Sequence, residues 1–364
     1  MYTYFIPVFA QSLGASFLDL GLIGGAYSIT YAVSPMIAGY LADKVNRAWL
    51  FSLGIMTVVL ATITLMLSHT VQDIMIVRAF AGFAFAFFWP ISEALVIDLA
   101  PLEKRVKEMG LYSVSWGSGF LIGPMLGGLV IQTHGFIWLF ASSALLISFS
   151  LLFTVVWIVP TQRNRTTRTT SDFSSTLPIM AGLLPAYMMT LCYGIVSGII
   201  MTIFPGYANS VGVDPVLIGL LFTAFTSARI LAFSVSERLL SLGESRILHA
   251  ASGVLVMGGL SIAVFANFRS FLPTMIVVGG CFGAIFPLAI SFISRHFPNE
   301  KLGAAAGSYE AVFGIGSAVG PILAGVVAQL ANIHWAFTLV SVFAALMFVF
   351  VTLWERGSHF EPRE

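Results

Sequence analysis

Four ionisable side chains lie inside long apolar stretches of the chain: Arg78, Glu93, Arg229 and Glu310. Charged groups are unfavourable in the interior of a bilayer, so those found there usually serve proton transfer, ion movement or substrate binding. Arg229 and Glu310 lie at similar depths in their stretches, and we expect them to form an ion pair. This pair is either structural or one that opens on protonation or substrate binding. Glu93 is our first candidate for a carboxylate that titrates during function.

The composition places these groups in a membrane protein. Of the 364 residues, 58% are hydrophobic and 9% are charged, whereas soluble proteins carry roughly 25% charged residues. The apolar runs are continuous and close to the ~20 residues that a helix needs to cross a bilayer, so they predict helices and not alternating strands. The net charge of +1 gives no sign of nucleic-acid binding. Cys192 and Cys281 lie in apolar runs and show no disulfide or metal-site spacing.

The pattern predicts an all-α membrane protein of twelve helices in two bundles of six, a monomer without cofactor or metal. The first apolar run, 1–12, is too short to span the bilayer. The helices expected after it cover 18–41, 49–67, 73–98, 109–132, 137–159, 178–209, a stretch beginning at 215, 247–266, 271–295, 302–329 and 335–354. The expected organisation is an N-terminal bundle over 1–160, a cytoplasmic linker over 161–177, a C-terminal bundle over 178–355 and a tail over 356–364.

Local signals mark two helix starts. Ser16 and Asp19 form a plausible capping box before the second helix. Asp214 is expected to cap the eighth helix, with Pro215 at its first position. With the loop after the second helix in the cytoplasm, 14 of the 17 Lys and Arg residues lie in cytoplasmic loops or the C-terminus. This asymmetry fixes the expected orientation, because cytoplasmic loops are enriched in basic residues.

The chain contains an internal repeat. The segment 117–128 returns as 314–325, at an offset of 197 residues (314 − 117 = 197), and the same offset aligns prolines, a Glu-Lys pair and a tryptophan. An offset of 198 pairs Pro7 with Pro205 (205 − 7 = 198). Shared membrane composition explains glycines in general but not these residues in register. Two similar halves that move against each other are typical of transporters.

The repeat also bears on the start of the chain. The seventh helix is expected to begin near Pro178, so its counterpart would begin about twenty residues before Met1 (178 − 198 = −20). We therefore expect the given sequence to lack the cytoplasmic half of the first helix, with a mis-assigned start codon as the simplest explanation.

The repeated segment carries small residues at helical spacing. Three glycines fall four apart, and a smooth glycine face lets another helix approach closely, while a proline permits a bend. We expect this face to be a packing hinge, and its residues are Gly119, Gly123, Pro124, Gly127 and Gly128, with Gly320 and Pro321 in the repeat.

The loop between the second and third helices reads Gly39-Tyr-Leu-Ala-Asp43-Lys44-Val-Asn-Arg47. At this point the chain resembles the major facilitator superfamily, which has Gly-x-Leu-Ala-Asp-Arg-x-Gly-Arg here; Lys44 is a conservative change and Asn46 replaces the second glycine. The resemblance implies two six-helix bundles around a central cavity that opens to alternate sides. It also implies that Asp43 and Arg47 latch the cytoplasmic gate, with Asp98 as their partner, whereas the simpler interpretation is a basic loop with a solvated Asp.

Two further features resemble the drug/proton antiporter subgroup of this family. The Gly-x-x-x-Gly-Pro-x-x-Gly-Gly pattern that begins at Gly119 resembles its helix 5 signature, although generic helix packing explains the pattern equally well. Arg78, with Gly82 four residues on, resembles its helix 4 arginine, which is implicated in proton coupling. The alternative for Arg78 is an extended side chain that reaches the outer interface.

The walls of the expected cavity are aromatic and weakly polar. The family lines its cavity with helices 1, 4, 7 and 10, which here offer Tyr4, Gln11, Trp89, Tyr187, Thr190, Tyr193 and Ser291. Such a wall suits an amphiphilic organic molecule better than a sugar, although most of these aromatic residues could simply be packing. We therefore expect not an enzyme but a secondary transporter in a prokaryotic cell membrane, most simply a proton-coupled exporter of small organic molecules. The alternatives are a metabolite uptake symporter or facilitator, and a receptor that kept the fold without transport.

Overall fold

The computed structural model describes residues 1–42, 44–161, 184–296 and 302–358, and all regular structure in these ranges is helical. The N-terminal half contains α1 (Ile6–Ser12), α2 (Phe17–Ala42), α3 (Arg47–Met66), α4 (Val71–Ala86), α5 (Trp89–Leu99), α6 (Arg105–His134), α7 (Phe136–Phe153) and α8 (Val159–Thr161). The C-terminal half contains α9 (Leu184–Gly198), α10 (Phe204–Ser210), α11 (Pro215–Ser234), α12 (Ser236–Ser241), α13 (Glu244–Val264), α14 (Phe268–His296), α15 (Leu302–Leu330) and α16 (Ile333–Ser358).

Several of these helices continue one another, so that the described segments form the expected order of twelve rods, the first of which is short. α4 and α5 form one rod, α7 and α8 are joined by a π-helical turn, and another π-helical turn joins α9 to α10. Ten helical stretches in the described residues are long and apolar enough to cross a membrane. The all-α membrane fold is therefore confirmed. Most of the predicted linker and the predicted start of the seventh helix lie outside the described residues.

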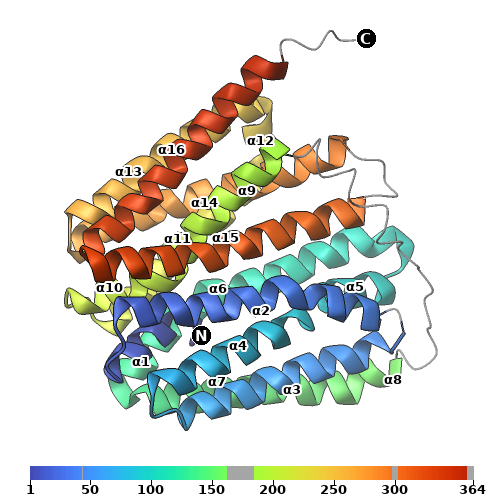
Figure 1. The fold of residues 1–364 in the computed structure, drawn as a ribbon. Helices are drawn as coiled ribbons and strands as arrows, with labels where there is room; N and C mark the ends of the chain where they lie inside the picture. The colour runs from blue at the N-terminus through green and yellow to red at the C-terminus, as the bar shows by residue number, and fades with distance from the viewer. Residues whose placement is uncertain (43, 162–183, 297–301, 359–364) are drawn as a thin grey trace.

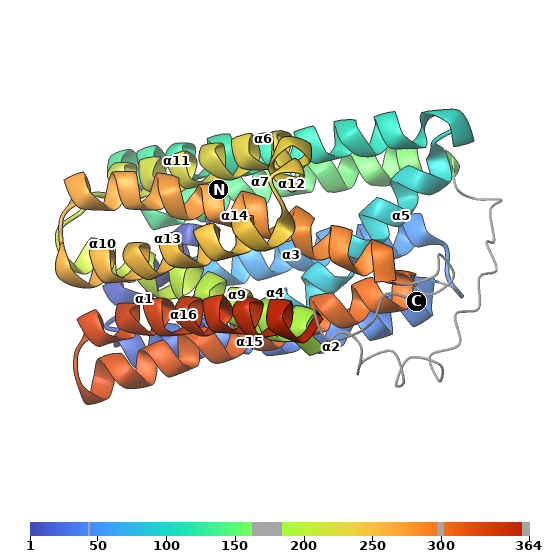
Figure 2. The ribbon, with the colours of Figure 1, turned by 90° about the horizontal axis from the view of Figure 1, so that it is seen from above.

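The two halves lie against each other along two pairs of helices. α2 of the first half runs beside α15 of the second, and α6 runs beside α11 (Figures 1 and 2). The rods converge at the end that holds α1 and α10 and spread toward the end that holds α8 and α12 (Figure 1). Buried aromatic and branched side chains of both halves form one continuous core, including Phe5, Phe140, Phe204 and Phe222.

The helix starts follow from local chemistry. The predicted capping box at α2 is formed: the Ser16 amide donates to the Asp19 carboxylate at 2.8 Å, and the Asp19 amide donates to the Ser16 hydroxyl at 3.2 Å. Asn46 caps α3, where its side-chain oxygen accepts a hydrogen bond from the Ala48 amide. This explains why an asparagine is suitable where the family pattern has glycine. The prediction for Asp214 was half wrong, because Pro215 begins α11 but the Asp214 side chain makes no capping hydrogen bond.

The predicted fourth helix, 73–98, is interrupted in the structure. α4 ends at Ala86 and α5 begins at Trp89, with Pro90 in its first turn. A proline lacks an amide hydrogen and disfavours helical geometry in the residue before it, so Pro90 accounts for the break. The break lies between Arg78 and Glu93, so these two candidate residues belong to different helical segments.

Candidate functional site

The seam between the halves is built from glycines that face prolines. A methyl group added at Gly219 on α11 would lie 2.5 Å from the carbonyl oxygen of Pro124 on α6. At the other helix pair, a methyl group at Gly21 on α2 would lie 3.1 Å from the carbonyl carbon of Pro321 on α15. Gly21 is the counterpart of Gly219 (219 − 198 = 21), and Pro321 is the counterpart of Pro124 (124 + 197 = 321). The repeat in the sequence is therefore a repeat of contacts.

A second pair of contacts obeys the same relation. Gly128 packs against Val216 at the start of α11, with 2.8 Å between an added methyl carbon and the Val216 Cα. Its counterpart Gly325 packs against Leu18 at the start of α2, with 3.0 Å to the Leu18 Cα. Backbone-to-backbone packing of this kind requires glycine. These glycine contacts hold the two halves together at the convergent end of the molecule, which is the outer side in the orientation that the basic residues predict.

A hydrogen bond on the pseudo-symmetry axis completes this seam. The Asn209 side-chain amide on α10 donates to the Gln11 side-chain oxygen on α1 at 3.0 Å. The two residues are 198 apart, which is the offset of the repeat (209 − 11 = 198). A second polar contact crosses the seam, where the Thr223 hydroxyl of α11 donates to the Leu121 carbonyl of α6 at 2.9 Å. Gln11, predicted as a cavity residue, therefore takes part in a contact between the two halves.

The predicted glycine face of α6 contacts both its own half and the other half of the molecule. Gly123 and Gly127 pack against Met1, with Phe5 also beside Gly127, so they face the first segment of their own half. Gly119 has no neighbour within 4 Å of an added methyl group. Of the five predicted hinge residues of α6, Pro124 and Gly128 lie against α11 of the other half. Gly320 in the repeat packs on Ile195 of α9, again within its own half.

Two of the predicted coupling residues come together from opposite halves. Glu93 on α5 and Glu310 on α15 are both exposed, although their helices are apolar, and their carboxylates lie close enough for their charges to interact. Tyr31 on α2 lies within range of both charges. Neither carboxylate forms an ion pair with any side chain that the structure describes. The sequence indicated each of the two glutamates as a candidate, but it gave no sign that they lie near each other.

The predicted Arg229–Glu310 ion pair is not formed in this structure, where both side chains are described. Arg229 is half-buried on α11, and its charge interacts electrostatically with the hydroxyl groups of Tyr4 and Tyr193. Matching depth in the sequence places two residues at the same level of the membrane, but it does not set the direction in which each helix face points. The two residues therefore share a level without touching.

Arg78 is buried, with 9% of its surface exposed, so its side chain does not extend to the outer interface. Its guanidinium carbon lies 4.0 Å from the ring centre of Tyr27 on α2. The Arg78 Nε atom has no hydrogen-bond partner among the described atoms. An aromatic face stabilises a desolvated cation, so the Tyr27 ring stabilises the buried Arg78 charge on α4.

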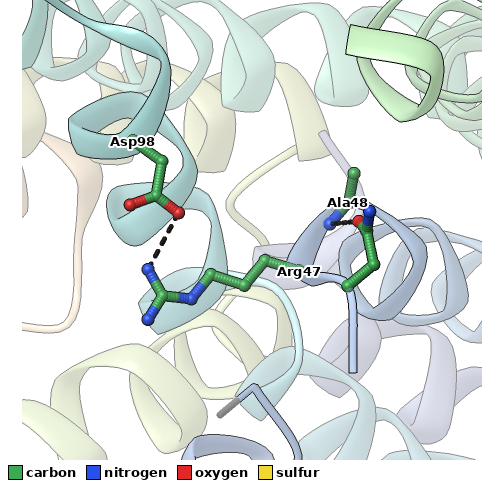
Figure 3. Close-up of polar contacts among 4 residues, drawn as sticks. Arg47, Ala48 and Asp98 are labelled. Carbon is green, nitrogen blue, oxygen red and sulfur yellow. Dashed lines mark hydrogen bonds and ion pairs between the residues drawn. The ribbon is translucent and has the colours of Figure 1, made fainter. Parts of the chain in front are cut away.

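An ion pair lies at the start of α3. The Arg47 Nη1 atom donates to Asp98 Oδ2 at 2.8 Å, with 17% and 14% of the two side chains exposed, and Figure 3 shows them meeting from α3 and α5. Lys44 is exposed at the same end of the molecule. Asp43 lies outside the described residues, and the surroundings of Gly39 are not described.

The predicted cavity residues are mostly enclosed. Tyr4 is buried and stacks on Phe222 of the other half at 4.1 Å. Tyr193 is buried between Phe282 and Phe313, and Tyr187 and Thr190 are buried as well. Trp89 remains half-buried at the start of α5, with its ring 6.0 Å from that of Trp116. The side chain of Ser291 is not among those described.

The fold and these contacts define the class of protein. Two pseudo-symmetric helical halves, closed at one end and carrying ionisable groups between apolar helices, make an integral multi-pass membrane transporter. A sequence profile of the Major Facilitator Superfamily matches residues 1–184 and 186–364. The chain belongs to the Major Facilitator Superfamily, whose members are transporters and not enzymes.

Relatives and solved structures agree with this assignment. The chain is 23% identical over 330 residues to the quinolone resistance protein NorA of Staphylococcus aureus, covering 88% of this chain and 83% of NorA. It is 33% identical over 135 residues to the putative multidrug resistance protein MdtD of Shigella flexneri, but this match spans only 29% of MdtD. The fold is similar to the nucleoside transporter NupG (TM-score 0.76, 16% identity, 99% of this chain and 94% of that chain). It is also similar to a bacterial homolog of the human lysosomal transporter Spinster in an inward-facing, unoccupied conformation (TM-score 0.77, 11% identity, 100% and 95%).

Proposed function

We propose that this transporter exports small organic molecules across a prokaryotic cell membrane in exchange for protons, with both termini of the full-length form in the cytoplasm. The observation that carries the proposal is the pair of exposed carboxylates, Glu93 and Glu310, which belong to opposite halves and lie within range of each other's charge. Carboxylates between membrane helices are the usual carriers of protons in secondary transporters. The sequence similarity to proteins named for quinolone and multidrug resistance supports export of organic compounds.

The remaining site residues take supporting roles in this proposal. The Arg47–Asp98 ion pair holds the cytoplasmic ends of α3 and α5 together, and with Asp43 and Lys44 it forms the proposed gate latch. Arg78 places a fixed positive charge in the N-terminal half, where it favours negative charge nearby. The glycine and proline contacts of the outer seam form the hinge about which the halves, 1–160 and 178–355, rock.

Substrate-driven proton movement in proteoliposomes, measured with its sign, tests the proposal. The protein is reconstituted with a pH-sensitive dye inside, and ethidium, norfloxacin or uridine is added outside. Proton movement opposite to ethidium or norfloxacin supports the exchange. Proton movement in the same direction as uridine supports the uptake alternative, and the absence of flux with every compound supports a non-transporting protein.

Two variants sharpen this test. Glu93→Gln and Glu310→Gln should each abolish proton movement, because a glutamine cannot take up the proton. Glu103→Gln removes an exposed carboxylate in the loop before α6 and should leave proton movement unchanged. Equal proton movement in all three variants would assign the coupling to other residues.

A further inference from the structure

A groove of about 540 Å³ lies between α13 and α14 of the C-terminal half. It is lined by residues of both helices, among them Ala250 and Met257 of α13 and Val277 of α14. α13 lies on the side of the C-terminal half away from the N-terminal half (Figure 1), and its close neighbours are α12, α14 and α16. The groove is therefore separate from the seam between the halves.

The groove opens toward the membrane. Both helices belong to stretches that are long and apolar enough to span a bilayer. The large side chains exposed on this surface are apolar, and they include Met257 and Leu260 of α13 and Ile276 and Val277 of α14. Leu255, on another face of α13, is buried. Exposed apolar side chains in a membrane span contact lipid chains, so the groove is accessible from the bilayer.

The two polar side chains that line the groove, His249 and Thr274, already make hydrogen bonds within the protein. The Thr274 hydroxyl donates to a backbone carbonyl one turn earlier in α14 at 2.8 Å and lies 2.9 Å from the Ser261 hydroxyl. His249 Nε2 lies 2.9 Å from the Thr352 hydroxyl, and Nδ1 lies 2.8 Å from the Ser245 carbonyl oxygen. The groove therefore suits an apolar chain better than a polar solute, which would lose its hydrogen bonds to water there.

A cationic side chain lies at the end of the groove that the basic residues predict to be cytoplasmic. Arg246 is exposed in the first turn of α13. Positions 246, 250 and 257 are spaced by four and seven residues, so Arg246 shares a helix face with Ala250 and Met257. Eleven residues separate Arg246 from Met257 (257 − 246 = 11), which is ~16 Å along a helix. This length is close to the ~15 Å of hydrocarbon in one leaflet.

We propose that this groove binds one anionic phospholipid of the cytoplasmic leaflet, with the phosphate at Arg246 and one acyl chain along Ala250, Met257 and Val277. The arginine attracts a negatively charged headgroup, and a long arginine side chain at the end of a span reaches the headgroup region. The acyl chain fills the gap between α13 and α14 and adds packing contacts to both helices. The site lies within one half, so it does not depend on the proposed exchange.

Native mass spectrometry of the full chain in detergent tests the proposal, with phosphatidylglycerol as the anionic lipid and phosphatidylethanolamine as the lipid without net charge. The parent should retain one tightly bound phosphatidylglycerol. Val277→Trp fills the groove from α14 and Ala250→Leu fills it from α13, so each should abolish this tight binding. Arg246→Gln should weaken the binding of phosphatidylglycerol about fivefold and leave the binding of phosphatidylethanolamine unchanged.

Matched variants separate this site from the general lipid shell. Val342 on α16 is 47% exposed and Val277 is 49% exposed, and each lies nine residues after the first residue of its helix (342 − 333 = 9, 277 − 268 = 9). Arg105 is exposed at the start of α6 in the other half. Val342→Trp and Arg105→Gln should both bind lipid as the parent does. The proposal is overturned if Val277→Trp retains phosphatidylglycerol as well as Val342→Trp does, or if Arg246→Gln keeps the affinity of the parent.

Discussion

Replacing Gly219 by alanine should open the outer side of the transporter. The added methyl carbon would lie 2.5 Å from the Pro124 carbonyl oxygen, whereas ordinary contact begins near 3.4 Å. The backbones of α11 and α6 must therefore separate by about 0.9 Å (3.4 − 2.5 = 0.9). The methyl carbon is fixed directly to the α11 backbone and the Pro124 oxygen is a backbone atom, so no side-chain rotation can relieve the contact.

The size of the effect follows from two opposing terms. Overpacking of a close contact costs about 1–3 kcal/mol, while alanine is favoured over glycine in a helix by about 1 kcal/mol. Gly253 on α13 provides a matched control, because an added methyl group there has no neighbour within 4 Å. Relative to Gly253→Ala, Gly219→Ala should disfavour the outer-closed state by about 1–3 kcal/mol, which is about 5- to 150-fold in the ratio of states.

Spin labels on the outer ends of the two halves measure this ratio. His134 ends α6, Val211 follows α10, and both are exposed. With cysteines at these positions, Gly219→Ala should add a population with a longer distance, and Gly253→Ala should not. If both substitutions leave the same distance distribution and differ only in thermal stability, the glycine contact is ordinary core packing and the reasoning is refuted.

Three further predictions concern individual contacts. The Gln11–Asn209 hydrogen bond should give a coupling of about 0.5–1.5 kcal/mol in a double-mutant cycle of alanine substitutions read by thermal unfolding; a zero coupling would contradict it. Asp98→Asn should lower the stability by about 1–3 kcal/mol because it removes the negative charge from the largely buried Arg47–Asp98 ion pair, and Arg47→Leu in the same chain should restore part of the loss. His249→Ala should lower the melting temperature more than His249→Gln does, because Nε2 lies 2.9 Å from a threonine hydroxyl of α16; equal losses would assign the effect to packing.

The sequence predicted the architecture well because its strongest signals have a direct physical cause. Gly128 and Gly325 are glycines because the backbone of the other half lies against each of them, so a repeat of small residues is also a repeat of contacts. The predicted helix boundaries largely agree with the structure because a capping residue such as Ser16 forms its hydrogen bonds with residues only three or four positions away in the sequence. The break between α4 and α5 could have been predicted from Pro90 itself. The apolar pattern continues through the proline and therefore favoured a single uninterrupted helix.

The site was less predictable because its contacts join separate helices. The ring of Tyr27 reaches Arg78 from another helix, and no local pattern connects these two residues. Depth along a helix can be counted from its end, which is why Arg229 and Glu310 were expected to pair. The rotation of each helix depends on the packing of its whole face, and in the folded chain Glu310 lies within range of the Glu93 charge.

The most direct test of the account is transport of ethidium against its gradient, driven only by protons. Proteoliposomes that contain ethidium are diluted so that the proton concentration differs across the membrane while the membrane potential is clamped. The account predicts that ethidium moves uphill in the direction opposite to the proton gradient, and that Glu310→Gln abolishes this movement. Uphill movement in the same direction as protons, or movement that persists at full rate in Glu310→Gln, would contradict it.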